Sequence, residues 1–338
     1  MPGINQTNLT GLVNESVMQK IWDISNIPLP FTDMIGKGTH DNIKAEFTTD
    51  ELAAPITSNA AVDGADLTGD NTKVGVRLGN FTQIGTKQVK VSSTAEAENS
   101  IGNQGKLAYQ VKERQKELRR DVEAQQLTHQ ASVAGDSNTT PGISAGLGAQ
   151  LKTNVSVGAT GAVGGYNTGT GLFAAPTAGT KRALSETTIR DILQAVYVAG
   201  GNTTCVMTIP GLIRKMSEYL FTSTARVATL TSQKNDGSSG DAMTAYGSVN
   251  VFVTDFGQTI QMRDNRIMQV DAAGVASMYM IDPTHIEQSI LRGYQVEPLG
   301  KTGLADKRLM SVEYSLLVLN EKSQGAIFDI DTTLTMVA

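Results

Sequence analysis

The sequence predicts an α+β protein in which roughly the first third of the chain finds little place to be buried against itself. Three observations predict this class. Residues 44–93 alternate like β-strands, residues 105–134 carry the strongest helical periodicity, and short strands mixed with two helices fill the second half. With 338 residues, the chain is long enough for two domains or one elaborated domain, and its 40 % hydrophobic residues can build a core.

Composition excludes several classes of protein. The net charge of −5 is too small to indicate a general nucleic-acid binder, and no apolar run approaches the length of a membrane span. The N-terminus lacks the basic and apolar regions of a secretory signal. A single cysteine, Cys205, excludes an intrachain disulfide framework and a cysteine-based zinc site. We therefore expect a soluble protein of a reducing compartment, without membrane, metal or cofactor.

Residues 1–43 have the pattern of an extended arm. A few apolar residues between Leu9 and Ile21 lie near helical spacing, and Pro28 and Pro30 then break the pattern. Such a segment has too few core candidates to bury its own surface. We therefore expect this segment to lie as an extended arm against a surface outside itself.

Residues 44–95 predict an extended β-hairpin loop. Alternation marks strands at 44–49, 73–78 and 87–92, and a tip of small residues separates the first two. A lone hairpin is marginally stable in water, so we expect a partner surface to stabilise this one. The tip carries Asp63 and Asp66, whose spacing is not that of an EF-hand, and a solvated turn explains them better than a calcium site.

The helix predicted at 105–134 would be about 45 Å long at 1.5 Å per residue. Leu107, Val111, Leu118 and Val122 form its apolar stripe. Acidic residues interleave with the basic ones, which argues against sequence-specific nucleic-acid binding and leaves non-specific contact with a polyanion open. The basic residues are Lys112, Arg114, Lys116, Arg119 and Arg120.

Residues 137–180 differ sharply from what precedes them. Only Lys152 is charged, and ten glycines lie between Gly142 and Gly179. The string Gly142–Gly146 matches the GxSxG nucleophile elbow, with Ser144 as nucleophile, but the elbow needs a strand before the serine and a helix after it. The segment is interpreted as an outward insertion or a contact loop, and these two alternatives stay open.

The remaining chain predicts a mixture of helices and strands. Helices are expected at 188–198 and 210–220, and a buried strand at 205–209. Short strands are expected at 249–255, 260–262, 267–270 and 277–281, and two long ones at 286–297 and 309–320.

No cluster of chemically active residues predicts an enzyme. The three histidines, His40, His129 and His285, share no local metal-ligand spacing. Cys205 lies in an apolar strand and is interpreted as an inert core thiol. The string ending in Gly300-Lys301-Thr302 lacks the first glycine of a phosphate-binding loop.

The order of these parts resembles the Hong Kong 97-type major capsid protein of tailed bacteriophages. Four strings resemble a major head protein subgroup of that superfamily. They are RLGNFTQIGTKQVKVSSTAEA (77–97), QVKERQKELRRDVEAQQ (110–126), VFVTDFGQTIQMRDNRIM (251–268) and EPLGKTGLADKRLMSVEYSLLVLNEKSQGAI (297–327).

The resemblance implies a division into named parts. Residues 1–43 would be the N-terminal arm and 44–95 the extended loop that reaches over an adjacent subunit. Residues 96–184 would form the peripheral domain, with the spine helix at 105–134 and the Gly-rich insertion at 137–180. Residues 185–282 would form the axial domain, and 283–338 would return to the peripheral domain as its long strands and C-terminus. Inter-subunit contacts of the loop are then expected at Glu46, Asp63, Asp66, Arg77 and Lys87.

The implied function is self-assembly, as hexamers and pentamers, into an icosahedral head around double-stranded DNA, first in the host cytoplasm and then in the virion. A portal and a separate scaffolding protein are expected partners, the latter because no long helical segment precedes residue 105; a decoration protein is left open. The alternatives are an encapsulin-like nanocompartment shell, a β-rich fibre or adhesin, and a hydrolase using Ser144.

Overall fold

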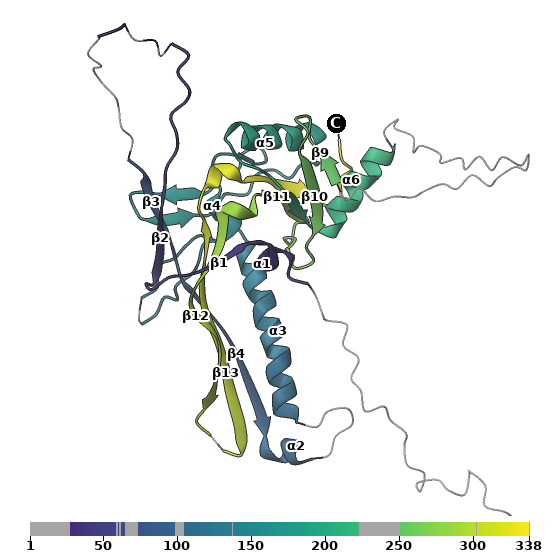
Figure 1. The fold of residues 1–338 in the computed structure, drawn as a ribbon. Helices are drawn as coiled ribbons and strands as arrows, with labels where there is room; N and C mark the ends of the chain where they lie inside the picture. Colours follow the sequence, from purple (N-terminus) through teal and green to yellow (C-terminus); the bar gives the residue numbers. More distant parts are fainter. Residues whose placement is uncertain are drawn as a thin grey trace, which may run out of the picture. The chain divides into compact units, whose positions relative to one another are not determined.

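The computed structural model describes residues 28–58, 60, 62–64, 74–98, 105–136, 138–222, 251–301 and 303–337 (Figure 1). Most of the predicted arm, including its apolar residues between Leu9 and Ile21, lies outside these ranges. The chain divides into two compact units. One contains Thr86–Arg119 and Gln295–Ser311, and the other contains Leu29–Gly85, Arg120–Tyr294 and Val312–Ala338.

The larger unit is built on a six-stranded mixed sheet with the order β5-β14-β11-β8-β10-β9. Strands β8 and β10 run parallel, as do β5 and β14, and the remaining pairs are antiparallel. The main hydrophobic core lies on this sheet. Its strands are β5 (Val155–Ser156), β8 (Cys205–Thr208), β9 (Val251–Val253), β10 (Thr259–Asp264), β11 (Val275–Ile281) and β14 (Gly325–Asp331).

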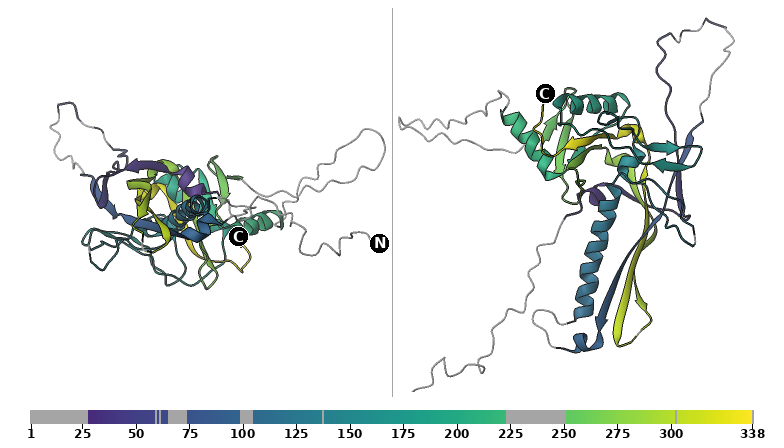
Figure 2. Two further views of the ribbon diagram at one scale, coloured as in Figure 1. Left: turned by 90° about the horizontal axis from the view of Figure 1, so that it is seen from below. Right: turned by 180° about the vertical axis from the view of Figure 1, so that it is seen from behind.

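Two helices accompany this sheet, α5 (Glu186–Val198) and α6 (Pro210–Thr222) (Figure 2). α5 packs on β14, and helical spacing brings its buried Ile189, Leu193 and Val196 to one face. Gly200 follows the C-cap residue of this helix with a φ of +90°, which suits glycine, and the Gly201 amide closes the last turn on Val196 O at 2.9 Å.

One strand prediction in this region was wrong, and one strand was missed. Residues 267–270 form no strand, because the Asn265 side chain accepts the Ile267 amide at 2.8 Å and turns the chain. β14 was not predicted as a separate strand. All seven of its residues are buried, so its sequence lacks the alternation that marks a half-exposed strand.

A four-stranded sheet has the order β1-β12-β13-β4. Its two 14-residue strands correspond to the predicted long strands. The members are β1 (Gly36–Thr39), β4 (Gln83–Ser92), β12 (Ile286–Leu299) and β13 (Ala305–Val318); the short helices α1 (Pro30–Met34), η2 (Pro283–His285) and η3 (Glu321–Ser323) lie next to them in sequence.

The smaller unit contains α2 (Ser93–Ala97) and the first part of α3 (Lys106–Gln126). Ser92 caps α2 by accepting the Ala95 amide at 3.2 Å. The Glu96 carboxylate accepts the Leu107 amide at 3.0 Å, and Lys106 donates to Glu98 O at 3.1 Å. These bonds hold the short helix against the start of the long one.

The predicted spine helix is real but shorter than expected. α3 ends at Gln126 instead of 134, and its 21 residues span about 32 Å. The Thr128 amide and hydroxyl both bond to Gln125 O, at 3.1 and 2.7 Å, and this turn ends the helix. His129 and Val133 therefore belong to the chain after the helix.

The ribbon, defined as residues 44–81, consists of β2 (Lys44–Thr49) and β3 (Val76–Phe81) with the connection between them. The strands pair antiparallel, with Lys44 opposite Phe81 and Thr49 opposite Val76. Nearby in the same unit, the Gly-rich segment forms α4 (Leu147–Gln150) and the hairpin of β6 (Gly165–Asn167) and β7 (Leu172–Ala174). β7 contacts β3, and the right view of Figure 2 shows the teal arrows of the hairpin next to the ribbon strands.

Candidate inter-subunit surfaces

The ribbon is held across its strands by charge. Arg77 donates to Glu46, and Lys44 Nζ lies 3.4 Å from the same carboxylate. Antiparallel register puts Glu46 opposite Gly79, so Arg77 is its diagonal neighbour on one face. The hydrogen bond from Arg77, followed by that from Lys44, lowers the pKa of Glu46. Two of the predicted loop residues are thus brought together, in an exposed pair that contributes little stability.

The ribbon also exposes an unusual density of large apolar side chains. Leu52 is 94 % exposed and Val74 is 89 % exposed. Single exposed apolar residues are normal on protein surfaces, whereas a concentration of them marks an interaction surface. The apolar surface of the ribbon and its flanks comprises Ile43, Leu52, Ile56, Val62, Val74, Val76 and Ile84.

The other predicted loop residues are placed differently. Asp63 is exposed in a turn before Gly64, and Asp66 lies outside the described residues. Lys87 lies on β4 beyond the ribbon, where its Nζ is 3.9 Å from Glu117 of α3. Within the described ranges, no group of three or more His, Cys, Asp or Glu residues could hold a metal ion.

Two of the basic residues of α3 form helix-surface ion pairs with the interleaved acids. Lys116 binds Glu113 at 2.9 Å, and Arg114 binds Glu117 at 2.5 Å. Lys112 and Arg119 are exposed, while Arg120 has a buried Nε with no hydrogen-bond partner among the described residues. No described helix is both long enough and apolar enough to cross a membrane.

Ser144 is a structural residue in this fold. It is fully buried, and its Oγ accepts hydrogen bonds from Asn80 Nδ2 at 3.1 Å and the Leu316 amide at 3.2 Å. A serine nucleophile needs a general base next to its hydroxyl. The histidines are hydrogen bonded elsewhere, His40 to Ser289, His129 to Ser277 and His285 to Asp282.

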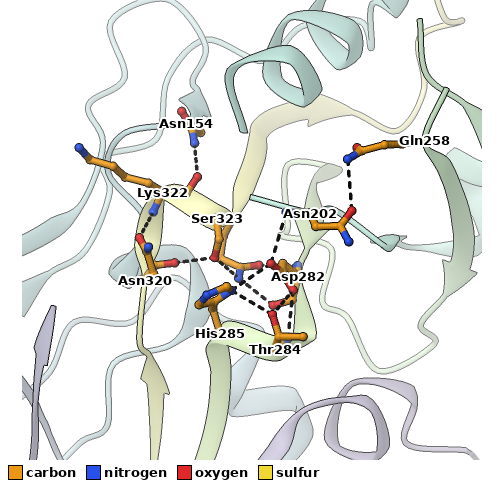
Figure 3. Close-up of polar contacts among 10 residues, drawn as sticks. Asn154, Asn202, Gln258, Asp282, Thr284, His285, Asn320, Lys322 and Ser323 are labelled. Atoms are coloured by element: carbon orange, nitrogen blue, oxygen red, sulfur yellow. Dashed lines mark hydrogen bonds and ion pairs between the residues drawn. The ribbon is translucent and has the colours of Figure 1, made fainter. Parts of the chain in front are cut away.

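The buried Asp282 is the centre of a polar cluster drawn in Figure 3. Its carboxylate accepts the Thr284 hydroxyl at 2.6 Å and faces His285 Nδ1 at 3.0 Å. Its backbone amide donates to the Gln324 side chain at 2.8 Å. These bonds cap η2 and join it to the start of β14, so the cluster is structural. Burial likewise raises the pKa of the Cys205 thiol to about 11, which fits the predicted inert core residue.

A second exposed apolar surface, which sequence reasoning missed, lies at the end of α5. Tyr197 stacks on Phe256 with ring centroids 5.0 Å apart, and Val198 and Val253 are exposed. Tyr197 and Val198 are the last two residues of α5, and Ala199 separates them from the two glycines that follow. Their position in a helical sequence could have marked them as the exposed end, but the contact with Phe256 depends on the fold.

Comparison with known proteins shows the family of the whole chain. A family model described as SU10 major capsid protein matches residues 4–331. The chain belongs to this family. A curated relative, the major capsid protein of Escherichia phage Phieco32, is 26 % identical over 329 residues, covering 88 % of this chain and 89 % of the relative.

Solved structures agree on the fold at low identity. The capsid of a native GTA particle matches with a TM-score of 0.61 and 11 % identity, over 96 % of this chain and 99 % of that one. A structure from Mycobacterium phage Adephagia matches at 0.58 and 9 %, over 98 % and 99 %. The SrpI encapsulin complex from Synechococcus elongatus matches at 0.59 and 9 %, over 99 % and 98 %.

Family membership confirms two predictions. The chain is a phage major capsid protein, a component of the virion capsid built from copies of itself, and its fold is of the Hong Kong 97 type. The exposed apolar ribbon is therefore a candidate contact between these copies. The encapsulin likeness, at 9 % identity, concerns the fold alone.

Proposed function

We propose that the chain assembles as hexamers and pentamers into the icosahedral head of a tailed phage and encloses its double-stranded DNA. The exposed apolar surface of the ribbon carries this proposal. A two-stranded ribbon that leaves Leu52 and Val74 almost fully exposed gains little from its own subunit. Lying across a neighbouring copy would bury those side chains and add about 25 cal/mol for each Å² removed from water.

The proposal assigns roles to the predicted parts. The loop would reach the adjacent subunit, with contacts at the residues expected from the sequence, Glu46, Asp63, Asp66, Arg77 and Lys87. The axial domain, 185–282, would meet its copies at capsomer centres, and the exposed Tyr197–Phe256 stack supports a contact from that region. The basic residues of the spine helix would face packaged DNA without reading its sequence.

The proposal also names partners and a place of assembly. Heads would form in the host cytoplasm with a portal and a separate scaffolding protein, and whether a decoration protein binds the shell stays open. The chain would act as a structural protein without catalysis. The shell would be stabilised by the sum of many contacts between subunits. Co-expression of the neighbouring phage genes, each omitted in turn, identifies which proteins closed heads require.

Deleting Ala53–Lys73 tests the central claim. The deletion removes the tip and leaves β2 and β3 joined by a short turn. We expect a folded subunit, with unchanged circular dichroism and thermal midpoint, that no longer forms closed shells in negative-stain images. The full-length chain under the same conditions is the control. Closed particles of normal size and yield after the deletion would contradict the proposal.

An encapsulin-like nanocompartment is the alternative that the sequence left open, and membership of the capsid-protein family disfavours it, because the match to SrpI concerns the fold alone. Purified particles distinguish the two: a capsid would package nuclease-protected DNA when portal and packaging proteins are present, and a nanocompartment would hold a cargo enzyme. A fibre or adhesin is disfavoured by α3, α5 and α6, since a β-rich fibre has no need of long helices.

A further inference from the structure

The base of the ribbon is fixed by one buried amide. Asn80, the second-last residue of β3, is fully buried. Its Nδ2 donates to Ser144 Oγ at 3.1 Å, Ala145 O at 3.3 Å and Leu316 O at 2.7 Å, and its Oδ1 accepts the Ala145 amide at 3.0 Å. One side chain thus joins the ribbon to the Gly-rich segment and to β13.

The Gly-rich segment makes matching bonds to β13. Ser144 Oγ accepts the Leu316 amide at 3.2 Å. Gln150 Nε2 donates to Leu316 O at 2.9 Å and Ala145 O at 3.0 Å, while its Oε1 accepts the Val318 amide at 3.1 Å. The backbone of β13 is therefore bonded by side chains of a segment inserted next to it.

A third set of bonds ties the same segment to the chain at and after the end of α3. Gln125 and Gln130 both donate to Ser144 O, at 2.7 and 2.8 Å, and Gln130 also donates to Gln83 Oε1 at 3.0 Å. Gln83 in turn accepts the Ser144 amide at 3.3 Å. Since Gln83 begins β4, just after the ribbon, these bonds hold the exit of the ribbon as Asn80 holds its base.

Glycine allows this close approach. A Cβ at position 142 would lie 2.8 Å from Thr82 O, and a Cβ at position 146 would lie 2.2 Å from Thr128 O. Any side chain at Gly142 or Gly146 would push the backbones apart. Gly142 thus allows the segment to pack closely against the ribbon base, and Gly146 allows it to pack against the chain after α3.

The hairpin β6–β7 adds an aromatic support on the ribbon. Lys44 Nζ lies 5.5 Å from the ring centroid of Phe81 and 6.0 Å from that of Tyr166, and Tyr166 packs edge-on against Phe173 at 5.0 Å. Lys44 and Phe81 face each other at the base of the ribbon, so the cation is shared between the ribbon and the hairpin. Beyond Thr49 and Val76, no described pairing continues.

We propose that Asn80 and residues 142–150 form a polar bracket that sets the direction in which the ribbon leaves its subunit. The bracket lets the ribbon reach a neighbouring copy without first ordering its base, which lowers the cost of association. The inference rests on the proposed inter-subunit role of the ribbon. It gives the Gly-rich segment a positioning role inside the subunit.

The test compares Asn80→Leu with Asn265→Leu. Asn265 is equally buried, and its side chain is also hydrogen bonded, to Glu123 at 2.7 Å and Ile267 at 2.8 Å, but away from the ribbon. Spin labels at Thr48→Cys and Thr187→Cys report the distance between the ribbon and α5 in dissociated subunits. We expect both substitutions to lower the thermal midpoint, but only Asn80→Leu to broaden the distance distribution and reduce closed particles by about tenfold.

Each outcome decides a different claim. The first outcome is that wild type forms closed shells and the Ala53–Lys73 deletion does not, while Asn80→Leu forms them and keeps a narrow distance distribution between the two labels. In that case the bracket is wrong and the proposed function stands. Equal assembly loss in both Asn→Leu variants also overturns the bracket, because stability alone then explains it. Normal shells from the deletion variant overturn the proposed function. Should Asn80→Leu fail to fold, Ser144→Ala, which removes a single acceptor, decides by the same two readouts.

Discussion

The six-stranded sheet and the ribbon use similar apolar residues with opposite results. In the sheet, Met207, Met278 and Ile327 are at most 1 % exposed. In the ribbon, Leu52 and Val74 are about nine-tenths exposed. The sheet is covered by helices and neighbouring strands, whereas the ribbon has only two strands and therefore leaves one surface without a cover.

This difference separates the stability of the subunit from its ability to assemble. Burial within the sheet stabilises the fold whether or not other copies are present. Apolar surface on the ribbon contributes only when a second copy covers it. A substitution that strongly destabilises the isolated subunit should therefore not be the one that most specifically impairs assembly, and the reverse should also hold.

The largest loss of subunit stability is expected in the sheet. Met207→Ala removes a fully buried side chain from the central strand β8 and should lower the free energy of unfolding by about 2–5 kcal/mol. Urea unfolding of dissociated subunits measures the change. The conservative Met207→Leu should lose less than half as much, and an equal loss would mean that packing volume is not the cause.

A smaller loss is expected at Glu123, which joins α1 to the sheet. Its buried carboxylate accepts the Phe31 and Thr32 amides and Asn265 Nδ2, at 3.3, 3.2 and 2.7 Å. A glutamine would turn a donor toward these N–H groups, so Glu123→Gln should cost about 1–3 kcal/mol. Chemical denaturation compares the variant with wild type.

The raised pKa of Glu123 should also make the stability of the subunit depend on pH. Burial raises its pKa above the ordinary value of 4.5. An acid with a raised pKa in the folded state favours folding most below its unfolded pKa, and this advantage is lost as the pH rises through the folded value. The stability of wild type relative to Glu123→Gln should therefore fall as the pH rises above 4.5. A constant difference between pH 4 and pH 7 would contradict the raised pKa.

Still smaller is the effect of breaking a surface ion pair on α3. Lys116→Ala removes the partner of Glu113 and should cost about 0.3–0.5 kcal/mol at low salt. The cost should shrink in 1 M salt, where the charges are screened. Thermal unfolding at two salt concentrations checks this, and a salt-independent loss would mean that the aliphatic stem, and not the charge, matters.

The smallest effect on the subunit belongs to the ribbon. Leu52→Asp should change subunit stability by less than about 0.5 kcal/mol, because the side chain is exposed. It should nevertheless reduce the yield of closed particles, since a charge would be buried against the neighbour. Leu52→Met keeps the apolar contact and is the control. Normal assembly of Leu52→Asp would remove Leu52 from the proposed interface.

Local signals predicted the elements whose residues alternate or repeat. The strand at 44–49 and the start of α3 agree with the sequence to within one residue, because alternation and an apolar stripe depend on neighbours in the chain. The end of α3 and the strand β14 did not follow. The hydrogen bonds of Thr128 end α3, and β14 is buried on both faces; neither feature produces a periodic pattern in the sequence.

Among the candidate contacts, the sequence predicted neither the pairing of Glu46 with Arg77 inside the ribbon nor the bracket. Glu46 and Arg77 were expected at an interface, and their pairing within the ribbon needed only the register of two adjacent strands. Asn80, Ser144 and Leu316 are separated by 64 and 172 residues, and no local pattern connects an asparagine in a strand with a serine among glycines.

The sequence by itself determined the α+β class, the first strand of the ribbon, the start of the long helix and the resemblance to phage capsid proteins. These follow from periodicity, composition and strings of residues, which are properties of neighbouring positions. Tertiary structure alone decided what the glycine-rich segment does. Its glycines form no strong local structure, and their value lies in the close approach of backbones that are distant along the chain.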